Sequence, residues 1–327
     1  MRRLLIIFIG VVLLALAWAL VWVNRPLDLR AGSVEFAVEP GSSPRAVAQT
    51  LVNRGVDASP DLLWLWFRIS GQARQIKAGS YEVTAGTSPF ELLGKLVRGE
   101  QSLLTVVVVE GWTFKQMRRA LSVAVQLRSD TQGLSDEDLM SRLGRQGMHP
   151  EGRFFPDTYT YAKGNSDLAV YRRALEAMDK QLAQAWSERS AQAQVQTPEQ
   201  ALILASIVEK ETGQAADRGL IAGVFNNRLR LGMPLQTDPT VIYGLGERFD
   251  GNLRKKDLQT DTAWNTYTRV GLPPTPIALP GKAALWAAVQ PATTSALYFV
   301  ARGDGSSQFS ATLQEHNRAV NIYQRSR

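Results

Sequence analysis

An apolar run close to the N-terminus constrains this chain more than any other feature. Residues 4–23, LLIIFIGVVLLALAWALVWV, are uncharged and almost wholly apolar. A helix of this length crosses about one bilayer core. Trp18 and Trp22 lie toward its outer end, where interfacial aromatic side chains are found. Arg2 and Arg3 precede the run and favour a cytoplasmic N-terminus, which predicts a tail at 1–3 followed by a transmembrane anchor at 4–23.

A cleaved signal peptide is the alternative to an anchor. Ala15-Leu16-Ala17 has the small-x-small form of a cleavage site. The apolar run continues beyond that tripeptide, which favours an anchor that stays in the mature protein. Arg25 and Arg30 weaken the charge asymmetry across the run without reversing it. We therefore expect a single-pass protein whose bulk lies outside the cytoplasm.

The composition excludes several classes of protein. The chain has 327 residues, of which 45% are hydrophobic and 20% charged, so one large or two modest folded domains are expected. The net charge of +7 suits an anionic membrane or cell-wall polymer, and without a compact basic run we expect no nucleic-acid partner. The absence of cysteine excludes disulfides and thiol catalysis. With only two histidines, His149 and His316, a His-rich metal site is not expected.

A small α+β domain is predicted at 34–101, after a linker at 24–33. Alternating apolar residues predict a strand at 34–38, and a second strand is predicted at 77–83. Three helix starts, each a serine followed by proline, lie between and after them. The order strand, helix, helix, strand, helix resembles the LysM carbohydrate-binding module. The resemblance is one of pattern, and a structural spacer remains the alternative.

A larger α+β domain is predicted at 102–327. It begins with a continuous apolar strand, SLLTVVVVEGW at 102–112. A long amphipathic helix is predicted at 167–191, and a hairpin at 296–310. A final helix carries His316, which as a lone histidine is more often structural than catalytic. The expected fold is thus a transmembrane helix, a small LysM-like α+β domain and a larger α+β catalytic domain.

The stretch ASIVEKETG places two glutamates at the end of a helix predicted over 198–212. At about 100° per residue, the bulky apolar side chains of this helix centre at about 160°. Glu211 falls at about 180° and continues that apolar face. Glu209 falls near 340°, beside Ala205 and Ser206 on the opposite side.

The two carboxyls are therefore expected to behave differently. Burial raises the pKa of a carboxyl, which suits Glu211 to act as a general acid near neutral pH, with the Thr212 hydroxyl beside it. Glu209 is expected to be better solvated than Glu211 and to stay charged, near Lys210 or Arg218. The alternative is a purely structural explanation, in which Glu211 is an ordinary glutamate at a helix end whose side chain reaches water. The helical angles favour Glu211 over Glu209 and do not by themselves make a site.

Two polar segments follow this helix. In LQTDPTVIYGLG, at 235–246, Asp238 before proline has a structural explanation as a helix N-cap. Gln236 and Thr237 have no equally good structural explanation. The segment 263–281, AWNTYTRVGLPPTPIALPG, is aromatic, polar and rich in proline. It suits a rigid loop wall for sugars, and an ordinary structured loop is the alternative.

These motifs together resemble the endolytic murein transglycosylase family (YceG-like). The resemblance is carried by LASIVEKET, VFNNRLRLGMPLQTDPTVIYGLG, AWNTYTRVGLPPTPIALPG, LYFVARGDG and EHNRAV, with EGRFFPDTYTY and KAGSYEV upstream. It covers essentially the whole chain in the family's order. It implies an enzyme of the bacterial cytoplasmic (inner) membrane, with its bulk on the periplasmic side, that cleaves peptidoglycan glycan strands internally.

The resemblance also implies a site. The family's catalytic glutamate precedes a threonine, which corresponds to Glu211 before Thr212. Trp264, Thr275 and Leu279 stand where the family commonly has Tyr, Gly and Asn, so the shape of their loop is expected to differ. The substrate-binding residues carried over from the family motifs are Gln236, Thr237, Asp238, Tyr243, Asn265, Thr266 and Tyr267.

The implied reaction needs one carboxylate, whereas ordinary glycosidases need two. Glu211 protonates the glycosidic oxygen between N-acetylmuramic acid (MurNAc) and N-acetylglucosamine (GlcNAc). It then takes the proton of the C6 hydroxyl, which attacks C1 to give a 1,6-anhydro end. No metal or cofactor is implied. The expected partners are peptidoglycan strands and membrane lipid, with peptidoglycan synthases or divisome and elongasome proteins as candidates. A membrane-anchored peptidoglycan-binding scaffold without catalysis is the alternative function.

Overall fold

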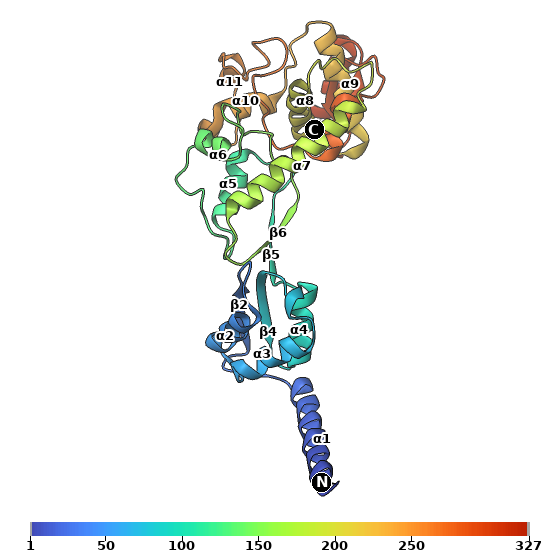
Figure 1. Ribbon diagram of the computed structural model, residues 1–327. Coiled ribbons are helices and arrows are strands. Elements are labelled where there is room, and N and C mark those ends of the chain that lie inside the picture. The colour runs from blue at the N-terminus through green and yellow to red at the C-terminus, as the bar shows by residue number, and fades with distance from the viewer. Residues whose placement is uncertain (1, 326–327) are drawn as a thin grey trace. The chain divides into compact units, whose positions relative to one another are not determined.

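A computed structural model describes residues 2–325. The chain divides into two compact units (Figure 1). Unit 1 comprises residues 1–104 with 160–165, and unit 2 comprises residues 105–159 with 166–327. The strands β5 (Leu103–Val107) and β6 (Thr158–Ala162) form a two-stranded sheet and contain the boundary between the units.

Unit 1 is a small α+β fold whose core lies between a two-stranded sheet and three helices. Strands β2 and β4 are antiparallel, and Phe36 opposite Tyr81 stacks on it with ring centroids 5.8 Å apart. The fully buried Leu51, Leu63 and Leu96 come from the three helices packed on the sheet. The elements of unit 1 are α1 (Arg2–Asn24), β1 (Asp28–Leu29), β2 (Ser33–Val38), α2 (Pro44–Arg54), β3 (Val56–Asp57), α3 (Pro60–Ile69), η1 (Ala73–Gln75), β4 (Gly79–Thr84) and α4 (Pro89–Arg98).

Helix α1 is long and apolar enough to cross a membrane. Its mean hydropathy of 3.1 and its lack of burial within the chain fit a membrane anchor or a signal sequence. Only its end joins the folded part of unit 1. Val23 is 7% exposed, and Leu27 donates its backbone N–H to the carbonyl of Thr87 at 2.9 Å.

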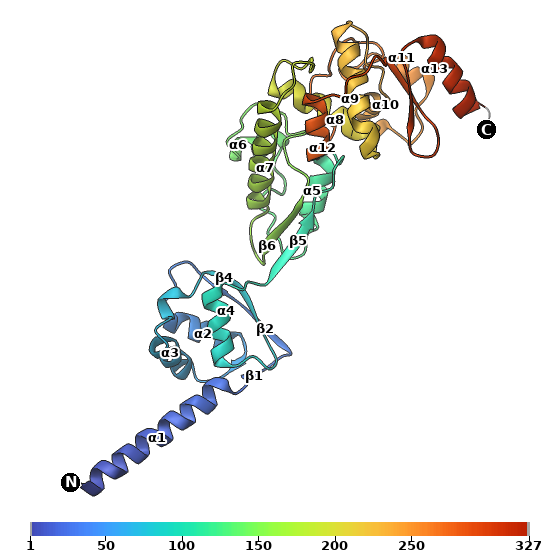
Figure 2. The ribbon, with the colours of Figure 1, turned by 90° about the vertical axis from the view of Figure 1, so that its right-hand side faces the viewer.

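Unit 2 is built around the helix α8. Helices α7, α9 and α12 pack around it, as Figure 2 shows. A separate antiparallel hairpin of β7 and β8 packs with α13. The helices and remaining strands of unit 2 are α5 (Phe114–Ser122), α6 (Asp136–Arg142), α7 (Asp167–Ser187), α8 (Pro198–Glu211), α9 (Ala215–Arg230), α10 (Asp238–Leu245), η2 (Gly246–Arg248), α11 (Lys255–Gln259), α12 (Lys282–Val289), β7 (Tyr298–Ala301), β8 (Ser307–Ser310), α13 (Leu313–Val320) and the π-helical turn η3 (Asn321–Arg325).

Helix α8 is buried all round, which the helical angles did not predict. Ala205 and Ser206, on the side expected to face water, are both 0% exposed. The Ser206 hydroxyl donates to the carbonyl of Ile203 at 2.7 Å and accepts the backbone N–H of Ile277 at 3.0 Å. Small side chains let other segments approach this face closely, so its low hydrophobicity does not mean exposure. The whole helix therefore acts as a rigid support for the residues at its end.

Candidate active site

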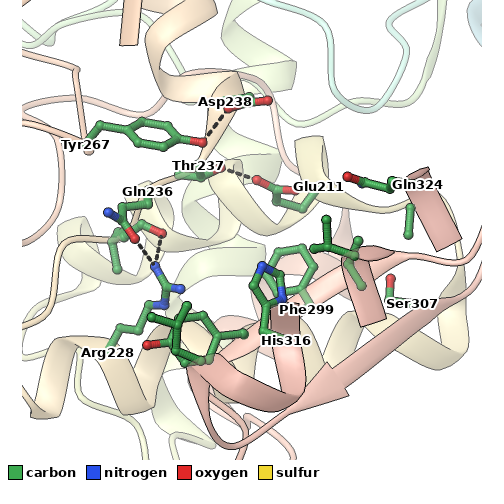
Figure 3. A pocket seen from close by; sticks show the side chains of 16 residues that line it. Glu211, Arg228, Gln236, Thr237, Asp238, Tyr267, Phe299, Ser307, His316 and Gln324 are labelled. Carbon is green, nitrogen blue, oxygen red and sulfur yellow. Dashed lines mark hydrogen bonds between the residues drawn. The ribbon is translucent and has the colours of Figure 1, made fainter. Parts of the chain in front are cut away.

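Glu211 is the last residue of α8 and lines a cavity of about 540 Å³. Residues 201–208 of α8 are all buried among its neighbours, which fixes where the Glu211 carboxyl emerges. In Figure 3 the side chains of Glu211 and Thr237 point toward one another, and the Thr237 hydroxyl donates a hydrogen bond to Oε1 of Glu211. The hydroxyl of Thr212, expected beside Glu211, instead accepts the backbone N–H of Gln214 at 2.9 Å.

The surroundings of Glu211 keep a substantial fraction of its carboxyl protonated near neutral pH. Burial raises the pKa of Glu211 to about 7, the negative charge of Asp238 adds to the rise, and the hydrogen bond from Thr237 opposes it. A carboxyl with this pKa can give up a proton and take one back near neutral pH. The side chain remains partly exposed in the cavity, so a substrate can reach it.

Residues 235–237 line the cavity and include one residue in a strained backbone conformation. Gln236 has a φ of 52°, in the left-handed region that glycine favours. Its backbone N–H donates to the carbonyl of Thr266 at 3.0 Å, and the backbone N–H of Thr237 donates to the Thr266 hydroxyl at 3.1 Å. Arg228 donates to the carbonyl of Leu235 at 2.9 Å and to Oε1 of Gln236 at 3.2 Å. Together these bonds hold the segment in place.

The side chain of Asp238 does not serve as a helix cap. Thr237 occupies the N-cap position of α10, and Asp238 is the first residue of the helix. The Tyr267 hydroxyl donates to Oδ1 of Asp238 at 2.5 Å, and both residues line the cavity (Figure 3). The capping explanation drawn from the sequence therefore does not account for the Asp238 carboxylate.

Asn265 and Thr266 lie behind the cavity wall. Asn265 is 0% exposed, and its side-chain amide donates to the carbonyls of Leu258 at 3.1 Å and Thr260 at 2.7 Å. Its Oδ1 accepts the backbone N–H of Tyr267 at 2.8 Å. Thr266 is 2% exposed and supports Thr237. These two residues are placed to hold Thr237 and Tyr267 in position.

Tyr243 lies away from the described residues that line the cavity around Glu211. Its ring packs edge-on against Trp264, with centroids 5.6 Å apart. Its hydroxyl is hydrogen-bonded to Glu151, a carboxyl that is 3% exposed. The structure thus groups Tyr243 with a second buried acid, which the sequence did not single out.

Glu209 has the basic neighbours that the sequence predicts, Lys210 and Arg218, but its side of α8 is covered and not open to water. It is half-buried, and its Oε2 accepts the backbone N–H of Gly281 at 2.9 Å, at the N-cap of α12. Burial raises the pKa of Glu209, and the charge of Glu110 adds to the rise while Arg218 opposes it. The error has the same physical cause as for Ser206, because other parts of unit 2 cover this side of α8.

The opposite wall of the cavity consists of residues that the sequence did not assign to the site. Arg228, Phe299 and His316 lie across the cavity from Asp238 in Figure 3. The Arg228 guanidinium carbon is 5.1 Å from the centroid of the Tyr298 ring, and His316 stacks on Tyr298 at 5.2 Å. They come from α9, β7 and α13, far apart in the chain. The motifs LYFVARGDG and EHNRAV were recognised, but nothing in their spacing links them to Glu211.

Two of the departures from the family motif contact each other. The indole N–H of Trp264 donates to the Thr275 hydroxyl at 3.0 Å. Leu279, the third, is 0% exposed, and its backbone N–H donates to the carbonyl of Trp112 at 2.7 Å. The hydrogen bonds of these three residues are therefore made within unit 2. Within residues 2–325, no group of three or more His, Cys, Asp or Glu side chains is placed to hold a metal ion.

A half-buried acid at a cavity lined by polar and aromatic side chains is the arrangement expected of an enzyme that cleaves glycans by acid catalysis. Comparison with known proteins identifies the family, because the model of the YceG-like family matches residues 36–322. The chain belongs to the YceG-like family.

Named relatives agree with this assignment. The chain is 32% identical over 308 residues to the endolytic murein transglycosylase of Bacillus subtilis (strain 168), covering 89% of this chain and 85% of the relative. It is 27% identical to the endolytic murein transglycosylase of Streptococcus pneumoniae serotype 2, covering 90% of this chain and 59% of the relative. A crystal structure of a YceG-like protein from Listeria monocytogenes is 29% identical and superposes with a TM-score of 0.57, covering 88% of this chain and 98% of that chain.

Proposed function

We infer that this chain is an endolytic murein transglycosylase, an enzyme that binds and cleaves the glycan strands of peptidoglycan. The observation that carries the inference is the 32% identity over 89% of the chain to a relative of that name. The cavity beside Glu211 supports it independently, since a carboxyl with a pKa of about 7 suits acid–base chemistry on a glycosidic bond.

We assign the acid and base roles to Glu211 alone. Its proton passes to the oxygen that leaves C1 of MurNAc as the bond to GlcNAc breaks. The C6 hydroxyl of the same MurNAc forms the new bond to C1, and its proton passes to Glu211. The product carries a 1,6-anhydro ring, no water is consumed, and Glu211 regains its original state. A second carboxylate that activates water, as in inverting glycosidases, is not needed.

The cavity residues support this assignment by their positions. Thr237 orients the Glu211 carboxyl through its hydrogen bond. Asp238 and Tyr267 form a hydrogen-bonded pair at the cavity, suited to sugar hydroxyls. Gln236 is exposed and presents its side-chain amide beside them. Asn265 and Thr266 act as positioning residues behind them, and we assign no substrate contact to Tyr243.

Mass analysis of peptidoglycan digested by the purified protein tests the reaction. We expect fragments ending in 1,6-anhydro-MurNAc, released from within strands. Reducing ends formed with incorporation of water would instead indicate a hydrolase and overturn the single-carboxyl mechanism. Strands that bind without being cut would favour the scaffold function predicted as the alternative.

We propose that α1 anchors the enzyme and that most of the chain acts outside the cytoplasm, where peptidoglycan lies. The proposed organisation is a tail at 1–3, an anchor at 4–23, a linker at 24–33, a LysM-like domain at 34–101 and a catalytic domain at 102–327. The order of β2, α2, α3, β4 and α4 supports the LysM-like assignment. Mass measurement of the intact protein from membranes tests the anchor, because a signal peptide would leave a shortened chain. Synthases and division or elongation proteins as partners stay predictions from the family resemblance.

A further inference from the structure

Helix α3 carries large apolar residues on the side that faces away from its own domain, beside the exposed Asp61 and Arg68. Leu63 and Phe67 form its inner face and are 0% exposed. On the outer face, Leu65 is 45% exposed and Ile69 is 65% exposed. A surface helix normally carries polar residues on its outer side, so a contiguous group of large exposed apolar side chains there indicates contact with a second apolar environment.

The outer residues form one continuous surface, which we name the α3 stripe: Leu62, Leu65, Trp66, Ile69 and Phe90. The first four recur at helical spacing along α3. Phe90, at the start of α4, is 59% exposed, and its ring centroid is 6.4 Å from that of Trp66. The indole N–H of Trp66 donates to the carbonyl of Pro89 at 3.1 Å. The only polar group of the stripe's side chains is therefore already satisfied.

The α3 stripe adjoins the point where α1 enters unit 1. Leu27 is hydrogen-bonded to Thr87, three residues before Phe90 in the chain. Trp22, near the end of α1, packs against the same hydrophobic cluster as Trp66. Figures 1 and 2 both draw α3 at the end of unit 1 that carries residues 25–29. A bilayer crossed by α1 would thus lie beside the stripe.

Basic side chains flank the α3 stripe. The guanidinium carbons of Arg45 and Arg68 lie 5.3 Å and 5.6 Å from the ring centroid of Trp64 on α3. Arg45 pairs with Asp61 at 3.1 Å, whereas Arg68 has no ion pair within the described part of the chain. Apolar and aromatic residues with arginines beside them are typical of helices that lie in the membrane interface.

We propose that the α3 stripe rests in the headgroup region of the bilayer that α1 crosses, so that the small domain lies flat against the membrane. The proposal rests on the anchoring proposed above and goes beyond it by assigning a second lipid contact. Lipid is favoured over another protein because α1 holds the stripe at the bilayer, where the local lipid concentration is very high. The stripe then contributes to fixing the orientation of unit 1 as well as its position.

The cysteine-free sequence makes a direct test simple. The full-length chain carrying Ile69→Cys or Phe90→Cys is labelled with an environment-sensitive fluorophore and placed in vesicles of phosphatidylethanolamine and phosphatidylglycerol. Glu39→Cys is the matched control, because Glu39 is exposed and follows the end of β2 remote from the linker. Lipids with nitroxides at known depths then report how deeply each label lies.

We expect the labels at 69 and 90 to shift to shorter emission wavelength and to be quenched most strongly at about 5–10 Å below the headgroup boundary. The label at 39 should be unshifted and unquenched. Replacing Leu65 and Phe90 by Asp should abolish the shift at 69. Equal water exposure of the labels at all three positions would overturn the proposal. So would an emission shift that depends on protein concentration without quenching by nitroxide lipid, because it would indicate that a second copy of the chain covers the stripe.

Two controls separate this proposal from those before it. Flotation of the unlabelled chain with vesicles tests the anchor. If the chain floats with the vesicles but the labels at 69 and 90 remain exposed to water, the lipid contact of the α3 stripe is rejected and the anchor is not. Cleavage of isolated peptidoglycan by the labelled proteins tests the enzyme function and does not depend on either membrane contact.

Discussion

Two carboxyls of unit 2 have similarly raised pKa values in very different surroundings. Burial raises the pKa of both Glu211 and Glu151 to about 7. Glu151 is 3% exposed, and its carboxylate oxygens are hydrogen-bonded within the protein. They accept the backbone N–H of Phe114 at 2.9 Å and bond the Tyr243 hydroxyl. Glu211 lines a cavity of about 540 Å³. A raised pKa therefore marks burial, and access to a cavity separates a reactive acid from a structural one.

Replacing Glu211 should have the largest effect on catalysis. Without an acidic proton, Glu211→Gln should cleave peptidoglycan about 10²–10⁴-fold more slowly, the usual contribution of a general acid. The amide keeps the size of the side chain, so the melting temperature should fall little or rise. Product formation measured by mass against wild type checks the rate. Retained cleavage would show that the proton comes from another group.

Replacing Glu151 should instead destabilise the fold. Glu151→Ala leaves the buried N–H of Phe114 without its acceptor and removes one of the two partners of the Tyr243 hydroxyl, which should lower the free energy of unfolding by about 1–3 kcal/mol. The turnover of the folded enzyme should stay within a few-fold of wild type. Denaturant unfolding measures the first effect. Glu137→Ala, at an exposed position of α6, serves as the control and should change stability by less than about 0.5 kcal/mol.

Removing the hydroxyl that holds Glu211 should give a smaller effect on rate. Thr237→Val keeps the shape and loses the hydrogen bond, which should slow cleavage about tenfold. Because that bond lowers the pKa of Glu211, its loss should also move the alkaline limb of the pH–rate profile to higher pH. Thr212→Val is the matched control, since its hydroxyl bonds the Gln214 backbone N–H. Equal profiles for the two variants would contradict the role of Thr237.

The last expected effect is a dependence of stability on pH. A carboxyl whose pKa is raised by folding from 4.5 to about 7 contributes fully to the free energy of unfolding below pH 4.5. This contribution is lost as the pH rises through 7. The wild-type contribution from these groups should therefore decline between those values. Unfolding measured across this range should show a shallower decline in Glu211→Gln and in Glu151→Gln. An unchanged slope in both variants would mean that neither proton is held by the fold.

The local elements were largely predictable because their signals are local. Helix α8 was expected over 198–212 and runs over Pro198–Glu211, with the Thr197 side chain accepting the backbone N–H of Gln200 at 3.2 Å. The environment of each face of α8 was not predictable. Helical angles show only which side chains of the helix are polar or apolar. They do not show which other segments cover each face, such as the one at Ile277, 71 residues further on, whose backbone N–H bonds the buried Ser206 hydroxyl.

The residues that line the cavity also differ in how far the sequence could predict them. Glu211, Gln236, Thr237 and Asp238 come from motifs with a recognisable composition, and the structure brings them together at one cavity. The wall of Arg228, Tyr298 and His316 depends on how α9, the β7–β8 hairpin and α13 pack, which no local pattern states. Glu151 carried a signal, since an acid beside an aromatic segment is a candidate for burial, but its partner Tyr243 lies in another element.

The position of Glu211 at the carboxyl end of α8 has a consequence for its electrostatics that involves no side chain. The peptide dipoles of a helix sum to a partial negative charge at this end, which opposes a second negative charge there by about 0.3–1 kcal/mol. The backbone itself therefore helps Glu211 to keep its proton. Substitutions of Asp238 or of the apolar neighbours would leave this contribution in place, so no single replacement around the carboxyl should return its pKa to that of a free glutamate.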